Sequence, residues 1–152
     1  VGAALDCGSL SAGLICDGIH VDPAAMRVAL RAKAGPGRIF LVTDAMATIG
    51  TDLTGFELNG RRVHRRDGRL TLADGTLAGA DIDMAASVRF LHFEVGAPLE
   101  TALAMASLNA AEALGIGGGR GRLVAGSAAD IVELDNALRA VRTWHGGVPA
   151  GD

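Results

Sequence analysis

Cysteine is scarce in this sequence, long apolar runs are missing, and positive charge is not in excess. The two cysteines, Cys7 and Cys16, lie nine positions apart, which is neither a zinc-ligand spacing nor enough for a disulfide framework. We therefore expect two reduced thiols in a cytoplasmic protein. No stretch approaches the ~20 apolar residues that span a bilayer. A net charge of -3 gives no electrostatic footprint for nucleic acid, so neither a membrane nor a nucleic acid is expected as a partner.

The first part of the chain predicts a strand, a helix and a second strand. Residues 14–16 are a short apolar run, typical of a strand that is covered on both faces. Asp22 and Pro23 are favourable starting residues for a helix, which Gly35 would stop. Residues 38–42 are again apolar. This order predicts parallel strands joined by a right-handed crossover, as in an α/β protein.

A stretch that alternates between apolar and polar residues follows, and it contains the dipeptides Asn59-Gly60 and Asp67-Gly68. These dipeptides are strong signals for tight hairpins, so we expect short antiparallel strands here. The arginine-rich residues 61–66 then form a strand with solvent-exposed side chains. A phosphate-binding role for these arginines is the alternative.

Helices are expected again in the second half of the chain. Their apolar periodicity covers residues 82–96, 98–106 and 109–114. The stripes of the first two are Met84, Val88, Leu91 and Val95, then Leu99, Ala102, Leu103 and Ala106. The glycine-rich residues 117–122 follow a helix and precede a strand, which favours a linker over a phosphate loop. Residues 129–135 and 140–147 predict two strands of a small β unit.

Polar residues follow both strands of the predicted parallel pair. Asp17 and His20 come after the first strand, and Asp44 comes after the second. Because the carboxyl ends of parallel strands meet at one edge, we expect these side chains to be neighbours. A carboxylate there can act as a general base, and an imidazole can bind or polarise a substrate. The alternatives are that Asp44 caps a following turn and that His20 is a hydrogen-bonded histidine near a helix start.

Four strings resemble a known family: LICDGIHVDP, LVTDAM, DGTLAGADIDM and LVAGSAADIVELD, in this order. Together they resemble the C-terminal part of the N-acetylglucosamine-6-phosphate deacetylase family of the amidohydrolase superfamily. The last string is shared by many amidohydrolases, whereas the other three are more specific. The resemblance implies an α/β fold, the C-terminal part of a (β/α)₈ TIM barrel with a small accompanying β-sandwich. Residues 1–122 would belong to the barrel, with a hairpin insertion at about 51–76, and residues 123–152 to the sandwich.

The resemblance also implies the chemistry of the site. Asp44 would be the catalytic general acid/base. The substrate, an amino-sugar phosphate, would be bound by seven residues: Asp17, Gly18, Ile19, His20, Leu77, Ala78 and Gly79. A divalent metal, zinc or iron, would activate the attacking water, but its ligands in the family, a glutamate and two histidines, lie on earlier strands. Nothing in this chain replaces them, so no metal ligand is assigned here, and we expect a part of a longer polypeptide.

Other functions stay open from the sequence. Another amidohydrolase, such as a different N-acyl amino-sugar deacetylase or a cyclic-amide hydrolase, is the alternative within enzymes. The GTLAG segment argues against the cyclic-amide option but says little about the exact sugar. A catalytically silent fragment or assembly module is the alternative outside enzymes, because the metal ligands are absent. By its resemblance, the complete enzyme is expected to be a cytoplasmic homodimer.

Overall fold

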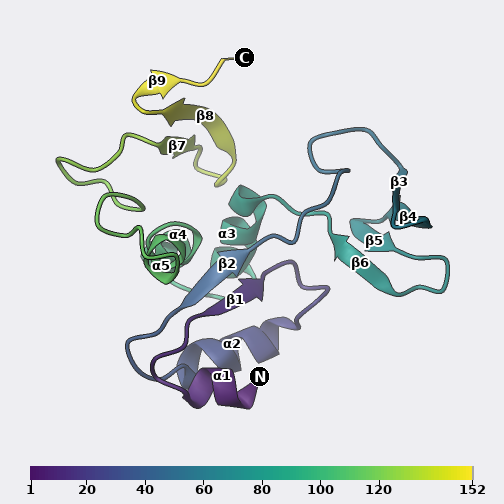
Figure 1. The fold of residues 1–152 in the computed structure, drawn as a ribbon, viewed down its shortest axis with the longest axis horizontal. Helices are drawn as coiled ribbons and strands as arrows, with labels where there is room; N and C mark the ends of the chain where they lie inside the picture. The colour runs from purple at the N-terminus through teal and green to yellow at the C-terminus, as the bar shows by residue number, and fades with distance from the viewer. Residues whose placement is uncertain (152) are drawn as a thin grey trace.

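The computed structural model describes residues 1–151, which form a mixed α/β arrangement with three separate sheets (Figure 1). After a short helix, α1 (Gly2–Asp6), strand β1 (Ala12–Ile15) pairs in parallel with β2 (Ile39–Val42). Helix α2 (Pro23–Ala32) makes the crossover between them. The predicted strand–helix–strand order is therefore confirmed.

Local residue chemistry explains where α2 begins. The Asp22 carboxylate accepts a hydrogen bond of 2.7 Å from the Ala24 amide, and Pro23 occupies the first turn, where its missing N–H costs nothing. Met26 is completely buried, and Ala29 and Leu30 pack against the same core. The helix thus presents one apolar face to the strands.

Three helices from the second half of the chain pack against the parallel strands. They are α3 (Met84–Phe93), α4 (Leu99–Ala106) and α5 (Leu108–Ala113). The Asp83 carboxylate caps α3 by accepting a 2.7 Å hydrogen bond from the Ala86 amide. The predicted apolar stripe is confirmed, since Val88 and Leu91 on α3 and Val95 just after its end are buried, and the partly buried Met84 packs against the same core.

The predicted stripe of α4 is partly wrong. Ala102 is buried as predicted, but Leu103 is 39% exposed and Met105 is only 2% exposed. Alanines contribute little to the apolar moment of this helix, so sequence periodicity does not separate the two neighbouring faces. Contacts with β2, α3 and α5 select the face that carries Met105.

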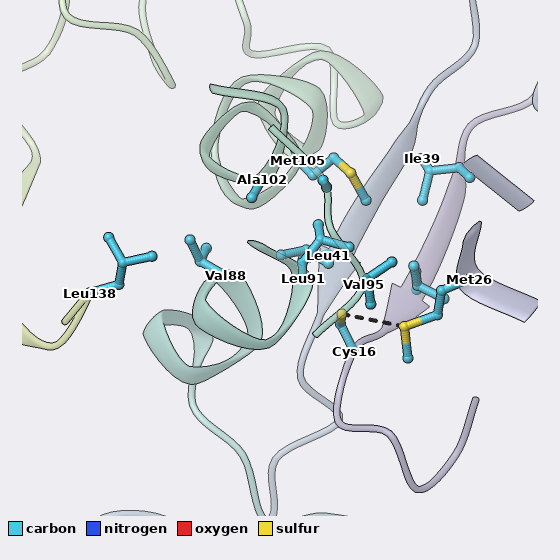
Figure 2. Close-up of a cluster of buried hydrophobic side chains, with 12 residues drawn as sticks. Cys16, Met26, Ile39, Leu41, Val88, Leu91, Val95, Ala102, Met105 and Leu138 are labelled. Carbon is cyan, nitrogen blue, oxygen red and sulfur yellow. Dashed lines mark hydrogen bonds between the residues drawn. The ribbon is translucent and has the colours of Figure 1, made fainter. Parts of the chain in front are cut away.

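The main core lies between the parallel strands and these helices (Figure 2). Its buried members are Leu14, Cys16, Met26, Ile39, Leu41, Val88, Leu91, Val95, Ala97, Ala102, Met105 and Leu138. The Cys16 sulfur lies 3.5 Å from that of Met26. Burial raises the pKa of the Cys16 thiol to about 12, and both Cys16 and Cys7 are free cysteines.

The prediction of a strand covered on both faces is wrong for the described residues. Leu14 and Leu41 point into the core, whereas the alternate residues Ile15, Phe40 and Val42 are only half-buried. Side chains alternate between the two faces of a strand, so one face of the β1–β2 pair is packed and the other is not. Two parallel strands also close no barrel in residues 1–151.

The second sheet is antiparallel and lies beside the carboxyl ends of the parallel strands (Figure 1). It contains β3 (Gly55–Leu58), β4 (Arg61–Arg66), β5 (Arg69–Thr71) and β6 (Leu77–Ala80). Both predicted hairpins are confirmed, since Asn59, Gly60, Asp67 and Gly68 all have φ between 49° and 73°. Positive φ at both central residues is the requirement of a type I′ turn.

The third sheet contains β7 (Ile131–Leu134), β8 (Ala140–His145) and β9 (Val148–Pro149). It is antiparallel and touches the core through Leu134 and Leu138. The two predicted strands are present with a third, but residues 1–151 provide no second sheet to make a sandwich with them. Nor does any helix in this range have the length and apolarity to cross a membrane.

Candidate active site

The turn after β1 is built around the Asp17 carboxylate. Its Oδ1 atom accepts hydrogen bonds of 2.9 Å from the amides of Ile19 and His20, and its Oδ2 atom lies 2.7 Å from His20 Nδ1. The side chain of Asp17 is 5% exposed and that of His20 is 18% exposed. One carboxylate therefore shapes the turn and orients the ring.

The same contacts set the ionisation of Asp17. Burial opposes its charge, but the amides of His20 and Ile19 and the His20 ring outweigh burial, so the pKa of this carboxyl lies below its ordinary value. An ionised carboxylate accepts the Nδ1 proton of His20, which leaves Nε2 as the ring atom that can meet a ligand. His20 is thus a hydrogen-bonded histidine whose second nitrogen is available for binding.

Gly18 is required at this turn for a packing reason. Its φ is +71°, and a Cβ atom there would lie 2.5 Å from Cζ of Phe90 on α3. Glycine adopts this backbone conformation without steric cost and lets the aromatic ring approach the turn. Helix α3 therefore supports the turn that holds Asp17 and His20.

Asp44 lies two residues after β2, and its side chain is exposed. The next element in the chain is strand β3 and not a helix that Asp44 could cap. Within residues 1–151 the Asp44 carboxylate makes no hydrogen bond. The Ala45 amide instead donates to Thr43 Oγ1 at 3.3 Å. These contacts do not support the alternative that Asp44 is a turn cap. Its φ of +53° is uncommon for a residue with a side chain.

Backbone contacts join Asp44 to the segment Leu77–Gly79 on β6. The Ala80 amide donates a 2.8 Å hydrogen bond to the Asp44 carbonyl oxygen, and Ala45 and Ala80 form an isolated parallel bridge. Gly79 has φ of +90°, and a Cβ atom there would meet the Met46 side chain and come within 3.1 Å of the Asp44 carbonyl oxygen. Only glycine fits this close approach.

All three predicted segments thus gather at one edge of the parallel pair. Ile15 is paired with Val42 in the parallel sheet. Asp17 comes two residues after Ile15 and Asp44 two residues after Val42, so both follow the same end of the strand pair. Leu77, Ala78 and Gly79 reach this edge through the Asp44–Ala80 hydrogen bond. No hydrogen bond in the described range joins the Asp17–His20 turn to Asp44 or β6, so strand pairing alone brings that turn close.

Sequence patterns do not mark Arg65 and Asp81, which lie beside this edge. Arg65 Nε donates a 2.7 Å hydrogen bond to Asp81 Oδ2, although the two residues lie 16 positions apart. They belong to opposite sides of β5, so their contact exists only once the second sheet has formed. No spacing rule for helices or hairpins predicts it.

These residues do not by themselves fit a metal ion. Within residues 1–151, no group of three or more histidine, cysteine, aspartate or glutamate side chains is placed to hold one. A structural metal site needs about four ligands and a catalytic one about three. The candidate site of this chain is therefore a carboxylate, an oriented imidazole and a glycine-containing strand end.

Comparison with known proteins identifies the family. The model of the amidohydrolase family matches residues 17–148, so this chain belongs to the amidohydrolase family. Within that family it matches the C-terminal portion of amino-sugar phosphate deacetylases.

Three relatives illustrate the match in sequence. The N-acetylgalactosamine-6-phosphate deacetylase of Shewanella sp. (strain ANA-3) is 37% identical over 97% of this chain and 37% of its own length. The human N-acetylglucosamine-6-phosphate deacetylase is 37% identical over 89% of this chain and 33% of its own length. A putative N-acetylgalactosamine-6-phosphate deacetylase of Escherichia coli K12 is 38% identical over 86% of this chain and 77% of its own length.

Solved structures agree with this assignment. The N-acetylglucosamine-6-phosphate deacetylase of Pasteurella multocida superposes with a TM-score of 0.93 at 34% identity, covering 100% of this chain and 39% of that one. The corresponding enzyme of Thermotoga maritima has a TM-score of 0.86 at 32% identity, covering 97% and 40%. The chain spans about two fifths of these structures.

Proposed function

We propose that this chain is the C-terminal part of an enzyme that hydrolyses the acetamide of N-acetylglucosamine 6-phosphate to glucosamine 6-phosphate and acetate. One observation carries the proposal. The exposed Asp44 carboxylate, without a hydrogen bond in the described range, stands at a strand end, fixed through its backbone to the glycine segment of β6. Relatives that are 37% identical to this chain are named as N-acetylglucosamine-6-phosphate deacetylases, which supports this substrate class.

Asp44 is the residue that moves the proton. It takes a proton from the attacking water as the oxygen adds to the acetyl carbonyl carbon, and then delivers it to the amine nitrogen as the C–N bond breaks. The products are acetate and a free amino sugar, so atoms and charge balance. A positioned carboxylate of this kind contributes about 10²–10⁴-fold to the rate.

The remaining residues of the site bind the substrate. His20 presents Nε2 to a polar group of the sugar phosphate while Asp17 holds the ring by Nδ1. Gly18 and Ile19 complete that turn, and Leu77, Ala78 and Gly79 allow close approach of the sugar to the β6 backbone. A solved structure of a Mycobacterium smegmatis deacetylase variant with N-acetyl-D-glucosamine-6-phosphate, 30% identical to this chain, supports this substrate class.

The half-buried face of the parallel strands supports a larger architecture. Ile15, Phe40 and Val42 would point into the interior of a TIM barrel, where branched apolar side chains pack in layers. Residues 1–122 would supply the end of that barrel and residues 123–152 the last strands of a β-sandwich. The ligands of a zinc or iron ion would then come from outside the present residues, in a cytoplasmic homodimer.

A second substrate has specific support. The Shewanella and Escherichia coli relatives are named as deacetylases of N-acetylgalactosamine 6-phosphate, at identities equal to those of the N-acetylglucosamine enzymes. The two sugars differ only in the configuration of one hydroxyl group. Acetate release from each sugar phosphate, compared at equal concentration, decides between them.

The test of Asp44 is made in the full-length protein. Asp44→Asn is expected to lower kcat by about 10²–10⁴-fold because the amide side chain cannot shuttle the proton. Asp52→Asn, which changes another exposed aspartate on the following loop, is the matched control and should retain normal turnover. Metal content should stay unchanged in both variants.

Two outcomes would contradict the proposal. Near-normal turnover in Asp44→Asn would overturn the role of Asp44. No acetate release from either sugar phosphate by the full-length protein, together with no bound metal, would instead support a catalytically silent module.

A further inference from the structure

Arg65 makes a set of contacts that no other arginine of β4 makes in the described structure. Its Nη1 atom donates a 2.6 Å hydrogen bond to the Thr51 carbonyl oxygen, in addition to the 2.7 Å bond from Nε to Asp81 Oδ2. Its backbone amide donates to the Thr54 carbonyl oxygen at 2.8 Å. One residue therefore holds the loop before β3 and the segment after β6.

The Arg65–Asp81 pair is not an ordinary surface ion pair. The Asp81 side chain is 5% exposed and that of Arg65 is 30% exposed. Asp81 Oδ1 is buried and has no hydrogen-bond partner in the described residues, so Arg65 is the charge that compensates this carboxylate. Arg62 and Arg66 lie on the opposite face of the same strand and are exposed.

Both segments that Arg65 holds are attached to Asp44. Asp81 directly follows Ala80, whose amide donates to the Asp44 carbonyl oxygen at 2.8 Å. Thr51 lies within the loop that leaves Asp44, seven residues further along the chain, and its amide donates to the Thr48 carbonyl oxygen. The guanidinium thus closes a ring of contacts that contains Asp44, whose φ of +53° needs support from its surroundings.

We propose that Arg65 is a positioning residue that orients the Asp44 carboxylate by fixing the loop after Asp44 to the end of β6. This inference rests on the proposed function, because it acts through Asp44 and not through contact with the substrate. A small displacement of a proton-transferring group can cost about 10²-fold in rate while substrate affinity is largely kept. Loss of Arg65 should therefore appear in kcat and not in KM.

The first experiment compares variants of the full-length protein with N-acetylglucosamine 6-phosphate as substrate. Arg65→Gln is expected to lower kcat by about 10–100-fold with KM within about threefold of the parent. Arg65→Lys should recover part of kcat, because it restores the charge beside Asp81 but not the two-pronged donor. Arg66→Gln, the adjacent exposed arginine, is the matched control with parental kcat and KM.

A double-mutant cycle separates positioning from a general structural role. If Arg65 acts through Asp44, then adding Arg65→Gln to Asp44→Asn should change the residual kcat by less than about twofold. If Arg65 only supports the fold, the second substitution should lower kcat by the same factor in both backgrounds, and that result overturns the proposal. The cycle is repeated with Arg65→Lys, so that poor folding of the glutamine variant does not prevent a decision.

The two proposals fail in different ways. Normal turnover in Asp44→Asn alone contradicts the role of Asp44 in the proposed function. If Asp44→Asn damages the enzyme, then parental kcat in the Arg65→Gln single variant, or an equal loss of kcat from Arg65→Gln in both backgrounds, contradicts only the positioning role of Arg65.

Discussion

Gly79 shows how one residue can serve a candidate site through packing as well as through the substrate contact proposed for it. The sequence resemblance assigns it to the substrate-binding segment, and the structure adds that its φ is +90°. A side chain there would meet Met46 and the Asp44 carbonyl oxygen. Gly79 therefore determines how closely β6 approaches the candidate catalytic residue.

Gly79→Ala is expected to destabilise the full-length protein more than Gly75→Ala does. Both glycines have positive φ, but a Cβ atom at Gly75 would meet nothing within 4 Å. The backbone conformation alone should cost about 1–2 kcal/mol of unfolding free energy in either variant, and overpacking should add about 1–3 kcal/mol for Gly79→Ala. Urea unfolding measures both losses. Equal losses would show that Met46 moves aside without cost.

Helix α4 shows what periodicity determines at the scale of one element. The position of the helix after Pro98 was predictable, because proline is favoured at a helix start. Its buried face was not, because alanine-rich helices have several faces of similar apolarity. The structure places Met105 in the core and leaves Leu103 partly exposed.

Substitutions on α4 test this orientation. Met105→Ala should lower the free energy of unfolding by about 2–5 kcal/mol, since it leaves a cavity in the main core. Leu103→Ala removes a side chain that is 39% exposed and should cost less than about 1 kcal/mol. Thermal or urea unfolding of the full-length variants gives the comparison. A larger loss for Leu103→Ala would mean that α4 is rotated from the position described here.

At the scale of the whole molecule, the described residues form a candidate site at one edge of the parallel strands, without a set of metal ligands. The parallel strands, the antiparallel second sheet and the turn after β1 bring together a carboxylate, an imidazole and a glycine segment. In residues 1–151 no histidine belongs to a group of three possible ligands. Metal binding by the full-length protein is therefore expected to be independent of this region.

Metal analysis of histidine variants checks this expectation. His20→Gln, His64→Gln, His92→Gln and His145→Gln should each leave the zinc and iron content of the full-length protein unchanged. His20→Gln should nevertheless raise KM, because Nε2 is the proposed substrate contact. Loss of metal in any of these variants would show that the chain contributes a ligand.

Much of the fold could be predicted because its signals are local. The Asp22 cap begins a helix, and the Asn59-Gly60 and Asp67-Gly68 turns form hairpins, whatever the rest of the chain does. The clustering of Asp17 and Asp44 was also predictable, because neighbouring parallel strands end at the same edge. The one-sided burial of β1 was not, since an apolar run does not show which faces have a partner.

Residue order alone was therefore sufficient for most helices and strands and for the parallel pairing, because caps, turns and strand ends depend on near neighbours in the chain. The candidate site residues Leu77, Ala78 and Gly79 came only from the family resemblance. The packed structure was needed for the buried face of α4, for the contact of Gly79 with Asp44, and for the link from Arg65 to Asp81. These features join residues that are distant in sequence and adjacent only in space, so no local sequence pattern predicts them.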